Sequence, residues 1–240
     1  MSDLVLVAGH AIWEGNLWKG GYPGQEMCYE RHLSDGLSIA KEKDAVLILS
    51  GGHTRPHLDV ERSEAEGMKA FIREHFPGHP LPVLCENYAR DSFENVLFSY
   101  LLFYQTMKEW PENLIIVSFG FKRLRFGIIR VGMKIPRFQF FGSGDKYLSM
   151  EDEEGAIKGE FNIMNRIMNS NEGKIRTWNP LHREKFFQEK REERMPKGVN
   201  ESSYMNEVKK CYGFEDLLFS LQSISEGPQW EDMKWPWENN

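Results

Sequence analysis

A cluster of basic side chains follows the apolar run Leu114–Val117. Lys122, Arg123 and Arg125 lie at the expected start of a helix, where cations oppose the helix dipole, which favours negative charge at that end. Guanidinium groups form forked contacts with phosphate and carboxylate groups. The cluster therefore predicts that these three residues bind an anion. Ion pairs with some of the chain's 36 acidic residues are the alternative.

Glycines follow two other apolar runs. Ser50, Gly51 and Gly52 end one run, and Gly9 ends another. Glycine permits positive φ and a close backbone approach, so successive N–H groups can cradle an anion. These four residues are therefore predicted to bind the ligand, although an ordinary tight turn explains a Gly-Gly pair equally well.

Carboxylate and amide side chains lie at the starts of two expected helices and at the end of one strand. Glu64 opens a helix, Glu86 ends an apolar run, and Asp91 and Glu94 have the spacing of a capping box. Asn95 falls beside the apolar face of its helix, where it needs buried partners. We predict Glu64 and Glu94 as catalytic carboxylates that act as a general base. Glu86 and Asn95 are predicted ligand-binding residues, and Glu86 is a further candidate base.

Three histidines, His10, His53 and His57, raise the question of a metal site. No cysteine or helical histidine pair accompanies them, and Pro56 disfavours a regular helix between His53 and His57. No metal site is predicted. His10 is instead expected to act as a polar contact or as a catalytic proton donor. The sequence lacks the GxGxxG, P-loop and GxSxG motifs, and it indicates no particular cofactor.

Short apolar runs alternate with longer helical patterns through the first half of the chain. The five runs are Leu4–Ala8, Val46–Leu49, Pro82–Cys85, Leu114–Val117 and Arg137–Phe141. Helices are expected between them, at about 25–43, 62–75, 92–110 and 122–133. This alternation predicts an α/β fold, a three-layer Rossmann-like, doubly wound and mainly parallel sheet of about five strands. Because ligands bind beyond the carboxyl ends of such strands, the candidate residues should lie together.

The chain changes character near residue 150, where charge density rises. We predict an α/β domain over residues 1–149 and a mostly helical extension over 150–240 that packs on it. The charge-rich stretch 185–194 is interpreted as a solvated helix face. Three tryptophans lie in the tail: Trp230, Trp235 and Trp237. Because disordered tails are poor in aromatic residues, this tail is expected to pack on the body or on a partner.

Composition limits the classes of partner. Hydrophobic residues make up 40% of the 240 residues, which is enough for one core. A net charge of -6 argues against broad binding to nucleic acid or to an anionic membrane. No apolar run approaches the roughly 18 residues of a spanning helix, and the cysteines are widely spaced. We expect a cytoplasmic protein that binds an anionic small molecule but neither nucleic acid nor membrane. The sequence does not decide whether the protein forms homo-oligomers.

The ordered set of these pieces resembles the YdcF/SanA/ElyC-like family, a domain-of-unknown-function family. The matching pieces, within roughly residues 3–145, are Ser50-Gly51-Gly52, Ser63-Glu64-Ala65, Glu86, Asp91-Ser92-x-Glu94-Asn95, and Ser118 with Arg125. The forms Gly9-His10-Ala11-Ile12 and Phe121–Phe126 are similar to a eukaryotic, largely fungal branch, whereas bacterial members usually carry His where this chain has Lys122. The resemblance implies a Rossmann-like fold with a nucleotide- or phosphate-sized cleft, and no settled reaction.

Three functional hypotheses follow. The first is an enzyme of hydrolase or transferase type that acts on a phosphorylated or nucleotide-like metabolite. The alternative is a non-catalytic protein that binds a nucleotide or adenosyl ligand in the same pocket. The third is an interaction protein that uses the extension over 150–240 as its working surface, and it leaves the basic cluster unexplained.

Overall fold

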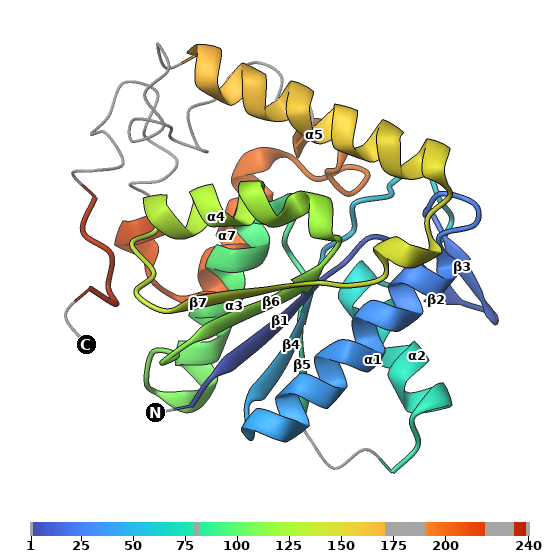
Figure 1. The fold of residues 1–240 in the computed structure, drawn as a ribbon. Coiled ribbons are helices and arrows are strands. Elements are labelled where there is room, and N and C mark those ends of the chain that lie inside the picture. Colours follow the sequence, from blue (N-terminus) through green and yellow to red (C-terminus); the bar gives the residue numbers. More distant parts are fainter. Residues whose placement is uncertain (1, 79–81, 171–190, 219–232, 239–240) are drawn as a thin grey trace.

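The structure is a computed structural model that describes residues 2–78, 82–170, 191–218 and 233–238. Its centre is a five-stranded parallel sheet with strand order β5-β4-β1-β6-β7 (Figure 1). The strands are β1 (Leu4–Ala8), β4 (Val46–Ser50), β5 (Val83–Glu86), β6 (Leu114–Ser118) and β7 (Phe138–Gly142). Each strand agrees with a predicted apolar run, and the predicted Rossmann-like fold is confirmed.

Helices cover both faces of the sheet. Helices α1 (Glu26–Lys43) and α2 (Glu64–His75) pack on one face, and α3 (Ser92–Met107) and α4 (Arg123–Gly132) pack on the other. Because alternate residues of a strand point to opposite faces, the residues of β1 divide between the two cores. Burial on both faces explains why these parallel strands are uninterrupted apolar runs in the sequence.

The order of the strands reverses at β1. The chain adds β4 and β5 on one side of β1 and then crosses over to add β6 and β7 on the other. The loops after β1 and β6 therefore leave the sheet toward opposite faces, and in such sheets ligands bind in the crevice between these loops. These two loops hold His10 and Lys122.

A short β-hairpin, not predicted from the sequence, follows β1. Its strands β2 (Ile12–Glu14) and β3 (Leu17–Lys19) pair antiparallel. Gly15 and Asn16 form the connection with φ values of 59° and 68°. Positive φ at both central positions is typical of the type I′ turn, so this Gly-Asn pair was the local signal for the hairpin.

The extension packs on the α/β domain through a shared core. Helix α5 (Met150–Ser170) crosses the top of the molecule in Figure 1, and α7 (Glu201–Tyr212) lies against α3. Trp235 and Trp237 are buried, and their indole N–H groups donate to the main-chain carbonyl oxygens of Gly132 and Met133 at the end of α4, at 3.0 and 2.8 Å. This part of the tail packs on the body, one of the two predicted outcomes, and Trp230 lies outside the described residues.

The predicted solvated face at 185–194 agrees with the exposed Glu192 and Glu193, but not with Arg191 and Arg194. Of this stretch, residues 191–194 are described. The Arg191 side chain is only 11% exposed and forms a 2.8 Å ion pair with Asp91, while Arg194 donates to the main-chain carbonyl oxygen of Arg90. Arg191 pairs with a partly buried carboxylate of the domain beneath it, a contact that the sequence pattern alone does not show.

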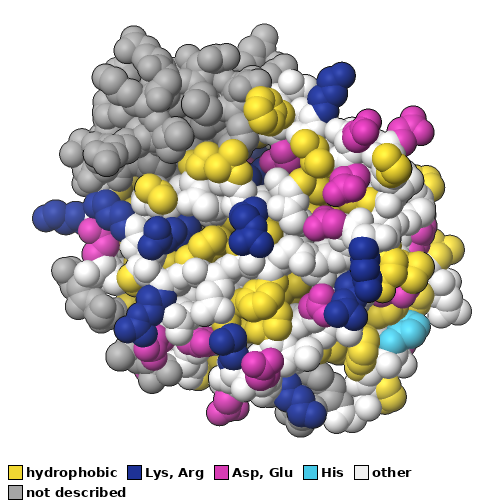
Figure 2. Space-filling view, viewed as in Figure 1, with side chains coloured by type: hydrophobic (Ala, Val, Ile, Leu, Met, Phe, Trp, Pro, Cys, Tyr) yellow, Lys and Arg dark blue, Asp and Glu magenta, His cyan; other side chains and the backbone are white. Residues whose placement is uncertain are grey.

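The molecular surface mixes charges of both signs. On the described part of the face in Figure 2, lysine and arginine side chains are scattered among carboxylates. Within the described ranges, no helix combines the length and the apolar character that a bilayer crossing requires.

Candidate functional site

A cavity of about 310 Å³ opens at the carboxyl ends of the strands. Its floor comes from the loops after β1 and β6, its walls from the starts of α2, α3 and α4, and its cover from α5. Six predicted site residues line it: Gly9, His10, Glu64, Asn95, Lys122 and Arg125. The described lining holds five cations (Arg55, Arg90, Lys122, Arg125 and Arg194) against three carboxylates (Glu64, Asp91 and Glu160). The local balance is therefore positive although the whole chain is acidic.

Glu64 begins α2 and directs its carboxylate into the cavity wall. Ser63 caps this helix in a full capping box with Glu66, which fixes the first turn. Thr54 donates its hydroxyl to Glu64 Oε1. The Glu64 side chain is 5% exposed, and no ion pair involves it among the described residues. A buried carboxylate without a cationic partner is a suitable proton acceptor for a bound water.

Gly9 and Gly51 leave room for the Glu64 side chain and do not bind an anion through their N–H groups. A Cβ atom at Gly9 or Gly51 would lie 2.6 or 2.7 Å from Glu64 Oε2, so both positions must lack a side chain. The predicted anion cradle is wrong, because Gly51 and Gly52 donate their N–H groups to the carbonyl oxygens of Glu86 (3.0 Å) and Ala89 (2.7 Å). The N–H of Gly9 likewise donates to the end of β4, at 2.7 Å, and none of the three glycines has positive φ.

Lys122 and His10 meet across the crevice between the β1 and β6 loops. Lys122 Nζ lies 3.1 Å from His10 Nδ1, and His10 Nε2 lies 3.3 Å from Ser118 Oγ. Burial and the nearby Lys122 charge lower the pKa of His10 well below its ordinary value. The ring is therefore neutral at pH 7, which favours the predicted role of His10 as a polar contact over that of a proton donor.

The group that titrates near neutrality in this cavity is Lys122. Burial, aided by the charge of Arg125, lowers the pKa of Lys122 to about 7. Its ammonium form can donate to His10 Nδ1, which leaves the imidazole proton on Nε2 facing Ser118. A lysine that carries a proton only part of the time near pH 7 can bind an anion and can also release a proton.

Arg125 already holds an anion supplied by the protein itself. Its Nε donates to Glu160 Oε2 at 3.0 Å, its Nη2 donates to Glu160 Oε1, and its Nη1 donates to Ser92 Oγ at 3.2 Å. Glu160 belongs to α5, the cover of the cavity. The counter-ion that the basic helix start required is therefore, in this structure, a carboxylate of the extension. A ligand anion must displace Glu160 to use the same guanidinium fork.

Replacing Glu160 with glutamine is expected to strengthen the binding of small anions. The change removes the carboxylate that competes for Arg125, and we expect roughly tenfold tighter binding of inorganic phosphate, equivalent to about 1.4 kcal/mol. Isothermal titration calorimetry would measure the change. Glu154→Gln, an exposed position of the same helix, is the matched control. Equal phosphate affinity of the Glu160 variant and wild type would show that Glu160 does not compete with phosphate for Arg125.

Six predicted residues lie outside the cavity lining: Ser50, Gly51, Gly52, Glu86, Glu94 and Arg123. Glu94 forms a 2.6 Å ion pair with Arg90 and lies 3.7 Å from Arg191. Its carboxylate is occupied by these two cations and does not reach the cavity, so the geometry does not support the predicted role of Glu94 as general base. Arg123 is exposed, with its guanidinium carbon 5.1 Å from the centre of the Phe140 ring. It points away because the first turn of α4 carries Lys122 and Arg125 on the side that faces the crevice.

Ser50, Glu86 and Asn95 form a linked set at the back of the cavity. Ser50 and Glu86 are fully buried behind the wall, and only Asn95 belongs to the lining. Ser50 Oγ lies 2.5 Å from Glu86 Oε2 and 2.9 Å from Asn95 Oδ1. The predicted ligand contacts of Ser50 and Glu86 are therefore replaced by contacts to each other and to Asn95.

The sequence-based prediction missed several residues of the lining. Thr54 and Arg55 lie two and three residues after Gly52, and their nearness to that turn was the available signal. Glu160 and Arg194 come from the extension, where no local pattern marks them. The aromatic part of the wall was also missed: Tyr29, Phe119 and Phe121.

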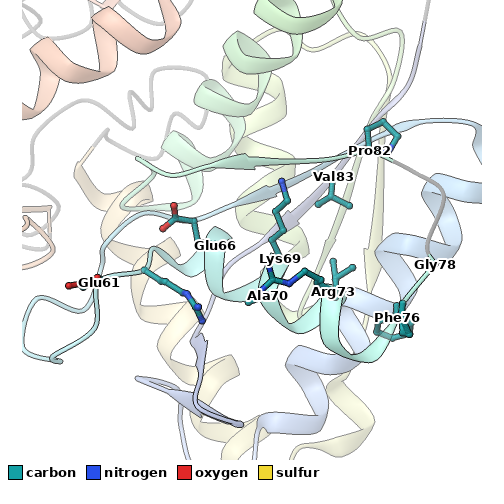
Figure 3. A pocket seen from close by; sticks show the side chains of 12 residues that line it. Glu61, Glu66, Lys69, Ala70, Arg73, Phe76, Gly78, Pro82 and Val83 are labelled. Carbon is teal, nitrogen blue, oxygen red and sulfur yellow. The ribbon is translucent and has the colours of Figure 1, made fainter.

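A second hollow, of about 990 Å³, lies between α2 and the start of β5 (Figure 3). Lys69 and Arg73 of α2 border it together with Phe76 and Val83. It is larger than the first cavity, but it lies at the amino end of β5, whereas ligands of open α/β sheets bind beyond the carboxyl ends. The smaller cavity is therefore the candidate site.

Comparisons of this chain with known proteins identify no family and no function. No family model, curated protein or solved structure matches it. Among the residues that the structure describes, no group of three or more histidine, cysteine, aspartate or glutamate side chains is placed to hold a metal ion. The geometry of the site itself therefore indicates its chemistry.

Proposed function

We propose that this protein is a hydrolase or transferase that acts on an anionic, phosphorylated or nucleotide-like small molecule in this cavity. The observation that carries the proposal is that one cavity contains both a cation and a carboxylate that are free to act on a ligand. Lys122 and Glu64 both line the cavity, and neither forms an ion pair among the described residues. A cation that lacks a carboxylate and a carboxylate that lacks a cation can each act on a substrate between them.

The cations supply the anion site. Lys122 and Arg55 approach the crevice from the β6 and β4 loops, and Arg194 approaches from the extension. Donors placed in a cavity with little water stabilise the negative charge that develops on phosphoryl oxygens. At about 310 Å³ the cavity is at the lower end of ligand sites, which span roughly 300–1,000 Å³. Its size supports a metabolite or mononucleotide rather than a dinucleotide.

The reaction uses Glu64 as base and Lys122 as acid. Glu64 takes a proton from a water molecule, the resulting hydroxide forms a bond to phosphorus, and the bond to the leaving-group oxygen breaks. The Lys122 ammonium gives its proton to that oxygen. In a transferase, an acceptor hydroxyl takes the place of the water. His10 stays neutral and positions the Lys122 side chain.

The resemblance to the YdcF/SanA/ElyC-like family is part of the same proposal. In its eukaryotic branch the position of the bacterial histidine is a lysine, here Lys122. A lysine whose pKa is lowered to about 7 by burial titrates in the range of a histidine. The substitution is therefore compatible with acid catalysis. The three cysteines form no disulfide, which supports the proposal of a cytoplasmic location.

The test compares binding and turnover across a panel of phosphomonoesters and nucleotides, with Lys122→Met as the variant. We expect at least one compound to raise the melting temperature and to be turned over. The variant should bind it at least about tenfold more weakly, because one desolvated cation–anion contact is lost. Lys43→Met, at the exposed end of α1, is the control. Wild-type affinity should fall as pH rises above 7, since Lys122 then loses its charge.

The outcomes separate enzyme from binding protein. Binding without turnover of any compound would favour the non-catalytic alternative, which the aromatic wall of Tyr29 and Phe121 supports by offering contacts to a planar base. If no compound binds, or if Lys122→Met behaves like Lys43→Met, the proposed site is wrong.

A further inference from the structure

A buried hydrogen-bonded chain connects the interior to the cavity wall. Glu86 and Ser50 are 0% exposed and Asn95 is 8% exposed. Ser50 Oγ lies 2.5 Å from Glu86 Oε2 and 2.9 Å from Asn95 Oδ1. Asn95 lies in the lining, and no other hydrogen bond of its side chain occurs among the described residues. The far end of the Asn95 amide is therefore available to a ligand.

The protonation state of Glu86 is coupled to the orientation of the Asn95 amide, because the hydroxyl between them has only one hydrogen to share. The Ser50 hydroxyl has a single hydrogen and cannot donate to a Glu86 carboxylate and to Asn95 Oδ1 together. If Glu86 carries a proton, it donates to Ser50, and Ser50 donates to Asn95 Oδ1, as the observed orientation requires. The Asn95 NH₂ group then faces the cavity. If Glu86 is ionised, Ser50 donates to it, and Asn95 must turn its NH₂ group to Ser50 and its oxygen to the cavity.

The surroundings of Glu86 permit both protonation states. Glu86 Oε1 accepts from the N–H groups of Tyr88 (2.6 Å) and Ala89 (3.1 Å) and from the Tyr212 hydroxyl (3.0 Å). Burial, only partly offset by these hydrogen bonds, raises the pKa of Glu86 to about 7. No ion pair involves Glu86 in the described part of the chain.

Four thiol and phenol groups near Glu86 are neutral at pH 7. They are Cys85 of β5, Tyr88 of the following loop, and Tyr204 and Tyr212 of α7, and burial raises the pKa of each. The charged Arg90 and Glu94 of the adjoining segment, with Glu201 of α7, pair with one another. Within this group, Glu86 is therefore the residue that changes charge near neutral pH.

We infer that Glu86 and Ser50 are positioning residues that set which end of the Asn95 amide faces the ligand. Protonated Glu86 presents the amide donor to an anion, and ionised Glu86 presents the amide oxygen, which repels it. Anion binding at the cavity is thereby coupled to proton uptake by a carboxyl group that never contacts the ligand. This inference rests on the proposed anionic ligand of the same cavity.

Glu86→Gln tests the coupling because it imitates the protonated acid. A glutamine NH₂ group can donate to Ser50, and its oxygen can accept from Tyr88, Ala89 and Tyr212. The probe is inorganic sulfate, whose charge is constant between pH 6 and 8, and calorimetry measures its affinity. At pH 6 the variant and wild type should bind alike. At pH 8 the variant should bind up to about tenfold more tightly, since only about a tenth of wild-type Glu86 is then protonated.

Lys122 also titrates in this range, but it contributes equally to both proteins and cancels in their ratio. Ser50→Ala breaks the link by a second route. In this variant the pH dependence that Glu86 adds should disappear, as it does in Glu86→Gln. Glu42→Gln, at an exposed position of α1, should keep the wild-type pH dependence. Urea unfolding verifies that each variant is folded.

The results that would contradict this inference differ from those that would contradict the proposed function. A merely structural role of Glu86 predicts weaker sulfate binding by Glu86→Gln at every pH, and equal pH dependence in variant and wild type would likewise overturn the inference while leaving the proposed site intact. Failure of wild type to bind sulfate or any phosphorylated compound would overturn the proposed function and this inference with it.

Discussion

Replacing Glu64 with glutamine is expected to lower turnover of a phosphorylated substrate by about 10²–10⁴-fold, the usual contribution of a general base. Glutamine keeps the shape of the side chain and can still accept from Thr54, which donates to Glu64 Oε1. It cannot take a proton from water. Binding of the same substrate should be retained or slightly strengthened, because a negative charge leaves the cavity.

The measurement is kcat by single-turnover and steady-state assays, with affinity measured separately by calorimetry. Glu66→Gln is the matched control on the same helix turn, because glutamine still satisfies the capping box with Ser63. Glu66 lies outside the cavity lining. A Glu64 variant that turns over substrate at the wild-type rate would remove Glu64 from the mechanism. A loss of binding together with turnover would assign it to ligand recognition instead.

Replacing Arg90 with alanine is expected to lower the free energy of unfolding by about 3–5 kcal/mol, the usual cost of breaking a buried ion pair. The Arg90 side chain is 2% exposed, lies 2.6 Å from both Glu94 and Glu201, and stacks 4.0 Å from the ring centre of Tyr204. Among the residues that the structure describes, its removal leaves the buried Glu94 carboxylate with one nearby cation, Arg191, at 3.7 Å.

Urea denaturation at pH 7 measures this loss, provided that the slope with denaturant is unchanged. Arg137→Ala is the control, because the Arg137 side chain is 62% exposed in its ion pair with Glu112. Exposed pairs contribute about 0–1 kcal/mol. A loss of less than about 1 kcal/mol at Arg90 would show that the extension contributes little stability through this contact. Equal losses at Arg90 and Arg137 would contradict the assignment of a buried network.

The apolar runs of the sequence predicted the sheet well, and for a physical reason. A strand covered on both faces can contain only side chains that tolerate burial, so its composition alone reveals it. The β2–β3 hairpin was missed because its strands are only three residues each. Such short strands have too little alternation to be recognised, and the Gly15-Asn16 turn was their only mark.

The sequence predicted where the candidate site lies better than it predicted the roles of the residues in it. Strand ends converge in any parallel sheet, so Gly9, His10 and Lys122 could be placed together without coordinates. The role of His10 could not be predicted, because its pKa depends on how deeply the loop is buried. The glycines after β4 fit an anion cradle equally well until their N–H groups were seen to be engaged.

The sequence by itself determined the order of strands and helices along the chain and the edge of the sheet at which polar residues gather. Periodicity and burial restrict the residue types of each segment, so a local pattern is enough to identify them. Only the tertiary structure decided which charge faces which. Arg125 meets Glu160, Arg90 meets Glu201, and Asp91 meets Arg191, pairs separated by 35 to 111 positions. No local pattern records such contacts, since any carboxylate of the extension has the same composition signal. The basic helix start indicated that an anion must be present, and the fold supplied that anion from α5.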